Sequence, residues 1–179
     1  MKRGSMCAVL VAVSVGWWLV GAVMAQAPKG SEKDQQFLRQ AASDGLAEVQ
    51  LGKMASERAA NPEVQRFGRR MVTEHTTANQ ELMALAQGKY ISVPTDLDKS
   101  PQEMAEKLAK MQGPNFDREY MQHMVADHEQ AVQLFTRAAQ ESQDADIRAF
   151  AAKTLPTLQE HREMARQLAQ QVGRMSQTR

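Results

Sequence analysis

The chain has 179 residues and a formal net charge of +1, with 22 basic and 21 acidic side chains and a single cysteine, Cys7. A near-neutral chain without a basic block is not expected to bind nucleic acid. A domain that begins beyond Cys7 has no disulfide to stabilise it, so it depends on its hydrophobic core.

Residues 1–25 have the pattern of a secretory signal peptide. Lys2 and Arg3 form a basic start, an apolar run follows, and Val23 and Ala25 stand at the −3 and −1 positions of a cleavage site. A retained transmembrane anchor is the alternative, because the run approaches the roughly 18 residues that span a bilayer. Cleavage would leave a net charge of −1, because Lys2 and Arg3 leave and no acidic residue does. The exported remainder, in the periplasm or cell envelope, would have no transmembrane segment, and its roughly 150 residues suffice for one domain.

Two long amphipathic helices are predicted first, at about 33–58 and 62–87. The stripe of the first consists of Phe37, Ala41, Asp44, Glu48, Leu51 and Ala55. The stripe of the second consists of Val64, Phe67, Met71, His75, Ala78, Leu82 and Leu85. Asn61 and Pro62 suit the cap and the first position of the second helix, and Gly88 suits its end.

Residues 88–113 interrupt this pattern and predict a crossover. A connection of about 25 residues is too long for a tight turn between antiparallel helices, but it can run the length of a bundle. Within it, Ser100–Glu103 reads as a capping box that begins a short helix over 101–111. Gly113-Pro114 is predicted to close the crossover.

Two further long helices are predicted at about 115–141 and 144–172. The second contains Pro156, which we interpret as a kink because the apolar stripe continues in phase on both sides. The segments 26–32 and 173–179 are expected to form a disordered lead-in and a frayed tail.

The two helical pairs align without gaps at an offset of 83 residues. Val49-Gln50-Leu51 falls on Val132-Gln133-Leu134, Asn61 on Asp144, and Phe67 on Phe150. One helix–turn–helix unit therefore occurs twice. This predicts an all-α fold over 33–172, a four-helix bundle of ferritin-like topology with one long crossover between the second and third helices. An extended helical array is the alternative, but such arrays need three or more repeats.

Four segments carry a more specific pattern: Met71–His75, Phe116–Tyr120, Met124–Glu129 and Phe150–His161. On these segments the chain, from about Asp34 to Leu168, resembles the ferritin-like bacterial family of unknown function often labelled "predicted outer membrane protein". The resemblance implies an exported helical bundle and supplies no activity.

Three histidines occupy stripe positions on three different helices, and each lies near the middle of its helix. Acidic residues of the first and third helices lie at about the same level. Imidazole and carboxylate groups on facing helices can bind zinc, copper or iron inside a bundle. The candidate ligands are His75, His128, His161, Glu48, Asp44 and Asp127.

The Glu-x-x-His motif of ferritin-like di-iron centres is absent. Val72 and Leu158 stand three residues before His75 and His161. The neighbouring acids, Glu74 and Glu160, are adjacent to the two histidines and are expected to be turned about 100° away. A di-iron oxidase is therefore not expected, and a different mononuclear or adventitious metal site remains.

Two other interpretations of the histidines stay open. They are buried core groups hydrogen-bonded to Asp44, Glu48 or Asp127, in which case acid would loosen the bundle as they charge. Alternatively, Met121 and Met124, with His123 beside them and His128 nearby, form a methionine–histidine set for copper. Methionine is also a common filler of irregular cores.

No phosphate-binding loop or nucleophile elbow is present, so no catalytic residue is predicted. The leading functional expectation is a non-enzymatic envelope protein with a structural, interaction or stress-related role. Its partner would be another envelope protein or a second copy of the chain. The alternative is a metal-binding bundle, and no pattern requires a cofactor other than such a divalent ion.

Overall fold

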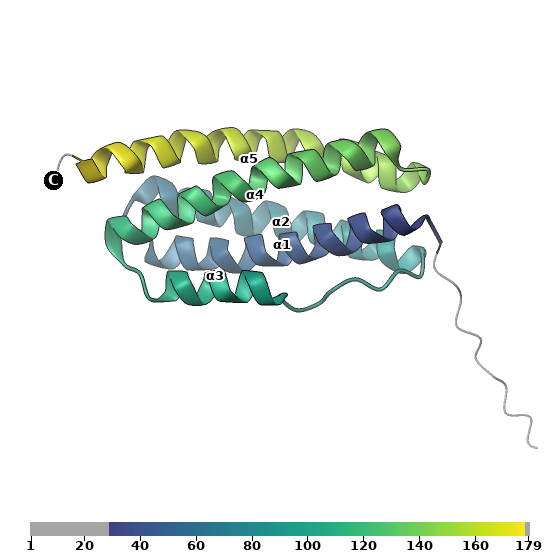
Figure 1. Ribbon diagram of the computed structural model, residues 1–179, viewed down its shortest axis with the longest axis horizontal. Coiled ribbons are helices and arrows are strands. Elements are labelled where there is room, and N and C mark those ends of the chain that lie inside the picture. Colours follow the sequence, from purple (N-terminus) through teal and green to yellow (C-terminus); the bar gives the residue numbers. More distant parts are fainter. Residues whose placement is uncertain (1–28, 178–179) are drawn as a thin grey trace, which may run out of the picture.

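The computed structural model describes residues 29–177, which form an all-α fold of five helices packed as a bundle (Figure 1). The helices are α1 Glu32–Arg58, α2 Pro62–Gly88, α3 Lys99–Ala109, α4 Gly113–Glu141 and α5 Ala145–Gln177. The predicted signal peptide, or retained anchor, lies outside the described residues. Among the helices described, none is long and apolar enough to cross a membrane.

The four long helices form two hairpins, α1 with α2 and α4 with α5. The hairpins face each other through α1 against α4 and α2 against α5. In Figure 1, α1 and α5 run in one direction and α2 and α4 in the other. The connection between α2 and α4 returns along the bundle, and its short helix α3 packs on α1 and α4.

The hydrophobic core consists of two clusters, one towards each end of the bundle. The first is centred on Phe37, Phe135 and Phe150, with the rings of Phe37 and Phe135 5.1 Å apart between centroids. The second contains Phe67 and Tyr120, 6.3 Å apart. Full burial of each large apolar side chain contributes about 1.5–3 kcal/mol, so the two clusters supply most of the favourable free energy of folding.

A polar layer separates the two clusters. On each long helix, the residues of one cluster precede a buried polar residue and those of the other follow it. The four residues of this layer are Glu48 of α1, His75 of α2, His128 of α4 and His161 of α5. All four helices therefore contribute one buried polar side chain to the middle of the bundle.

Three of the five described helices, α1, α2 and α5, begin with a side-chain cap. The backbone N–H of Asp34 donates to Ser31 Oγ, and Asp34 Oδ2 accepts from the Ser31 backbone, so α1 begins with a capping box. Asn61 Oδ1 accepts from the Glu63 backbone at the start of α2, as predicted from Asn61-Pro62. Asp144 caps α5 by accepting from the backbone N–H groups of Asp146 and Ile147.

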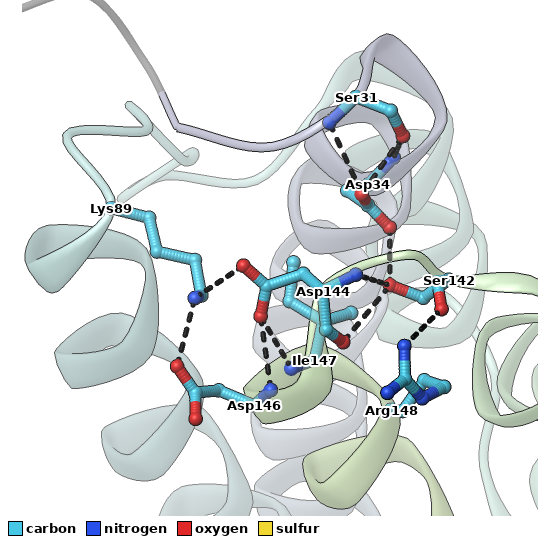
Figure 2. Close-up of polar contacts among 8 residues, drawn as sticks. All are labelled: Ser31, Asp34, Lys89, Ser142, Asp144, Asp146, Ile147 and Arg148. Atoms are coloured by element: carbon cyan, nitrogen blue, oxygen red, sulfur yellow. Dashed lines mark hydrogen bonds and ion pairs between the residues drawn. The ribbon is translucent and has the colours of Figure 1, made fainter.

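One end of the bundle is joined by a polar network (Figure 2). Ser142 Oγ, in the turn between α4 and α5, donates to Asp34 Oδ1 of α1 over 2.5 Å. Lys89, just beyond α2, donates to Asp144 over 2.6 Å and to Asp146 over 3.0 Å. The side chains of Lys89 and Asp144 are 9 % and 20 % exposed, so the ion pair between them is better shielded from solvent than an ordinary surface pair, whereas Asp146 is 75 % exposed. The network ties the two hairpins together at this end.

The expected crossover needs two corrections, and the expected tail needs one. The predicted capping box at Ser100–Glu103 is wrong, because α3 begins at Lys99 after Asp98, and the Asp98 carboxylate accepts from Ser43 Oγ of α1 instead of capping. Gly113 and Pro114 open α4 rather than closing the crossover, since proline is tolerated in a first helical turn. Residues 173–177 belong to α5, which also continues through Pro156.

The two helices of the first hairpin approach closely at a pair of glycines. A Cβ atom on Gly68 would lie 2.7 Å from the backbone oxygen of Gly52, and one on Gly52 would lie 2.8 Å from that of Gly68. These contacts involve backbone atoms, so a side chain at either position forces α1 and α2 apart. Gly88, at the end of α2, has nothing within 4 Å of such an atom.

We expect Gly68→Ala to destabilise the protein by about 1–3 kcal/mol, because overpacking outweighs the higher helix propensity of alanine. The matched control, Gly88→Ala, should be neutral or stabilise by up to about 1 kcal/mol. Urea unfolding monitored by circular dichroism measures both. Equal stabilisation by the two substitutions would contradict the close packing of α1 on α2.

Candidate metal centre

The polar layer brings three imidazole rings together inside the bundle. One ring nitrogen from each of His75, His128 and His161 lies within 4.8 Å of the other two. The ring centroids are 5.7 Å apart for His75 and His128, 5.4 Å for His75 and His161, and 5.3 Å for His128 and His161. The side chains are 8 %, 1 % and 1 % exposed in that order, so bulk water does not solvate them.

Hydrogen bonds determine which nitrogen carries the proton on two of the rings. His128 Nδ1 lies 2.9 Å from the backbone oxygen of Met124, one turn earlier on α4. His161 Nε2 lies 2.6 Å from Glu74 Oε2 of α2. A carbonyl or carboxylate oxygen only accepts, so each of these nitrogens donates, and the other nitrogen of the neutral ring carries a lone pair.

Three of the four remaining ring nitrogens are buried without a hydrogen-bond partner. They are His75 Nε2, His128 Nε2 and His161 Nδ1, and Glu48 Oε2 is likewise buried and unpartnered among the described residues. Buried polar atoms are normally satisfied, and each one left without a partner costs about 1–3 kcal/mol. A cation requires lone pairs of its ligands: His128 and His161 present them at these nitrogens, and His75 Nε2 presents one when the proton of its ring is on Nδ1.

A second set of side chains orients His161. Glu74 accepts from His161 through one carboxylate oxygen and from Arg70 Nε, 2.7 Å away, through the other. Arg70 also pairs with Glu160 of α5 at 2.8 Å. Glu74 follows from helical periodicity as a residue on the flank of the α2 stripe, turned away from His75, and it nevertheless reaches the site through His161. The packing of α5 along α2 brings that flank to His161, and nothing in the periodicity indicates it.

All six residues singled out in the sequence line one cavity of about 70 Å³. Glu48 Oε1 lies 3.6 Å from His128 Nδ1. Asp44 accepts from Gln40 Nε2 at 2.8 Å, and Asp127 lies 2.9 Å from His123 Nε2. Four acidic residues line the cavity, namely Asp44, Glu48, Glu74 and Asp127, and no lysine or arginine does.

Burial keeps the imidazoles neutral. Desolvation lowers the pKa of His75 well below its usual range and that of His128 to about 4, and neighbouring imidazoles lower both further. Desolvation also lowers the pKa of His161, against the opposing effect of Glu74. Conversely, burial raises the pKa of Glu48 well above its usual range and that of Asp44 to about 6. The rings therefore present lone pairs, not protons, at neutral pH.

The expected methionine–histidine set does not form around this cavity. Met121 and Met124 belong to the second apolar cluster, and no methionine side chain is among the residues that line the cavity. Met124 contributes only its backbone oxygen, which accepts from His128. His123 pairs with Asp127. The donor set of the cavity is thus nitrogen and oxygen.

Gly45 accounts for the asymmetry of the site. It is equivalent to His128 in the 83-residue repeat, but a Cβ atom at Gly45 would clash with the Asn79 side chain of α2. The space that a fourth imidazole would need is therefore occupied by an amide. The layer therefore contains three histidines, and α1 contributes Glu48, which lies one turn after Gly45.

Comparisons with known proteins place the fold but assign no activity. The family model described as "Domain of unknown function (DUF4142)" matches residues 21–168. No curated protein matches the chain. Among solved structures, CopM in its Cu(II)-bound form superposes with a TM-score of 0.65 at 18 % identity, covering 77 % of this chain and 96 % of CopM.

Two DUF305 proteins are also similar in structure. The fragment from Deinococcus radiodurans has a TM-score of 0.68 at 13 % identity, covering 82 % of this chain and 99 % of its own. The protein from Streptomyces coelicolor, described as presumed to be secreted, has a TM-score of 0.67 at 14 % identity, covering 79 % and 94 %. At these identities the likeness extends to the fold alone.

We expect the free energy of unfolding to fall as the pH is lowered from about 7.5 to 5. The three histidines have lower pKa values in the folded protein, so below about pH 6.5 the unfolded chain binds more protons. Their contribution is complete above that pH and is lost as the pH falls towards the folded value, about 4 for His128. For each proton that the unfolded chain binds in excess of the folded protein, the free energy of unfolding falls by about 1.4 kcal/mol per pH unit of acidification.

Glu48 and Asp44 oppose this trend, because their raised pKa values make the folded protein bind protons first. Glu48→Gln should therefore give a steeper loss of stability on acidification than the wild-type protein. Urea unfolding at several pH values measures both slopes. A profile of the Glu48→Gln protein that stays flat from pH 7.5 to 5 would contradict buried neutral imidazoles.

Proposed function

This chain belongs to the family described as a domain of unknown function (DUF4142), and we propose that it binds one divalent transition-metal ion through His75, His128 and His161. The observation that carries the proposal is that each imidazole keeps one buried nitrogen without a hydrogen-bond partner. Glu48 supplies negative charge beside the ion, because a divalent cation opposes the burial that raises the pKa of this carboxyl.

The donor set favours Cu²⁺ or Zn²⁺. Neutral imidazole suits both ions, and Cu²⁺ binds most tightly in the divalent series. Metal–nitrogen distances of 2.0–2.1 Å place tetrahedral ligands about 3.4 Å apart. The nitrogens, which lie within 4.8 Å of one another, need to approach by at most about 1.4 Å, which side-chain rotation can supply.

A purely structural role for the histidines is the rival interpretation. It accounts for His161 bonded to Glu74 and His128 bonded to the Met124 backbone. It does not account for three unpartnered imidazole nitrogens on residues that line one cavity together with acids and with no lysine or arginine. Under that interpretation, water alone fills the cavity and no ion binds in stoichiometric amount.

CopM supports the proposal by analogy of fold. It has been solved in Cu(II)-, Cu(I)- and silver-bound forms, so a bundle of this architecture accommodates such ions. The ligands proposed here come from this chain's own residues. We place the function outside catalysis, because no Glu-x-x-His pair, nucleophile or phosphate loop accompanies the site.

The cellular setting extends the proposal. The pattern of residues 1–25 and the DUF305 protein described as presumed to be secreted support export to the periplasm or cell envelope. The ferritin-like connectivity predicted from the repeat remains a prediction, as does association with an envelope partner or a second copy. An exported protein that binds a transition metal would serve as a store, buffer or carrier of that ion.

We expect untagged protein at pH 7.5 to bind Cu²⁺ and Zn²⁺ with a stoichiometry close to one in isothermal titration calorimetry. His128→Ala should weaken binding by more than about a hundredfold, because it removes a direct ligand. Glu74→Gln should weaken it by about 10–100-fold, because it removes the group that orients His161.

His123→Ala is the matched control, since His123 is the one histidine of the chain outside the triad. It should leave the stoichiometry unchanged. Circular dichroism at the titration temperature verifies that each variant is folded. If the wild-type protein binds no more tightly than the His128→Ala variant, the histidines are structural and the proposed function is wrong.

A further inference from the structure

The residues around the triad suggest how an ion reaches it. Resting on the proposed function, we infer that a divalent cation passes Asp127 and Asp44 on its way to the histidines, and that these two carboxylates set the rate of binding without coordinating the bound ion. Both line the same cavity as the triad, and each comes from a different hairpin.

Exposure decreases along this path. The Asp127 side chain is 33 % exposed and Asp44 is likewise half-buried, whereas the Glu48 side chain is only 6 % exposed. Beyond Glu48 lies His128, which is 1 % exposed. The acids therefore connect the surface to the buried imidazoles in steps, and Glu48 Oε2, which is buried and unpartnered, is the innermost of them.

The two aspartates act together on this path. The negative charges of Asp127 and Asp44 both raise the pKa of Glu48, and the charge of Asp127 also raises the pKa of Asp44. In the described part of the chain, neither forms an ion pair with lysine or arginine. Gln40 and His123 hold the carboxylates in place. A hydrated cation arriving here meets uncompensated negative charge, which raises its local concentration.

The opposite flank of the triad is less suited to passage. Glu74 is also 33 % exposed, but its two oxygens are occupied by His161 and by Arg70. The Arg70 guanidinium extends from there to Glu160. A cation approaching from this side meets a fixed positive charge and a carboxylate that is already bonded.

Geometry separates the two aspartates from the ligands. The cluster whose candidate ligand atoms lie within 4.8 Å of one another contains the three histidines and neither aspartate. Direct coordination requires oxygens at about 2 Å from the ion, together with those nitrogens. The aspartates are therefore close enough to attract the ion electrostatically and are outside the set that would hold it.

The test is stopped-flow mixing of Cu²⁺ with the Asp44→Asn/Asp127→Asn protein at pH 7.5 and low ionic strength, followed by ultraviolet absorbance. We expect the association rate constant to fall by about tenfold or more, and its dependence on salt to weaken. The dissociation rate constant should change less than about threefold, because neither carboxylate coordinates the bound ion. The affinity measured by calorimetry should then fall by no more than about the factor lost from the association rate constant, whereas removal of a ligand would raise the dissociation rate constant.

The matched control is Glu57→Gln/Glu106→Gln, which removes the same charge at two exposed positions and should keep wild-type rates. Single Asp127→Asn, with about half of the effect on a logarithmic scale, replaces the double variant if that protein does not fold. Unchanged rates, or a dissociation rate constant raised by more than about tenfold, would overturn the inference, while stoichiometric wild-type binding would still support the proposed function. Absence of wild-type binding would overturn both.

Discussion

A buried polar layer lies in the middle of the bundle, and the two apolar clusters must supply the free energy that holds it there. Three imidazoles and Glu48 occupy the middle of the core, and four of their polar atoms have no partner among the described residues. At about 1–3 kcal/mol each, these atoms cost several kcal/mol, a large part of the 5–15 kcal/mol by which domains are stable. Two apolar clusters and the network of Ser142, Lys89 and Asp144 hold the helices in place around that layer. A ligand that satisfies these polar atoms would therefore stabilise the folded protein.

The same layer explains why a cation is the ligand that fits. Desolvation favours the neutral form of the titratable groups in it, which lowers the pKa values of the imidazoles and raises that of Glu48. A divalent ion would satisfy the nitrogens together and would favour the ionised form of Glu48. The tautomers of His128 and His161 are already set by the Met124 backbone and by Glu74, so little reorganisation of these rings is needed.

Much of this arrangement could be predicted from the sequence, because it follows from helical periodicity. The stripes of the four long helices and the 83-residue repeat indicate a bundle, and the mid-helix positions of His75, His128 and His161 place them at one level. What periodicity lacks is the rotation of one helix against the next. Periodicity alone therefore does not bring Glu74 to His161, and it does not show that Asn79 fills the space beside Gly45. It also groups Met121 and Met124 with the histidines, although both pack in the second apolar cluster. The start of α3 after Asp98 was not predicted, because the Asp98 carboxylate accepts a hydrogen bond from Ser43, fifty-five residues earlier in the chain, and does not cap the helix.

The most direct test of the account is X-ray absorption spectroscopy of the protein loaded with one equivalent of Zn²⁺ or Cu²⁺. The account predicts a first shell dominated by three nitrogens at about 2.0 Å, with the multiple-scattering signal of imidazole and no sulfur. A sulfur shell near 2.3 Å would place the ion on methionine, and a shell of oxygens alone would place it on surface carboxylates. Either result would contradict a metal centre built from His75, His128 and His161.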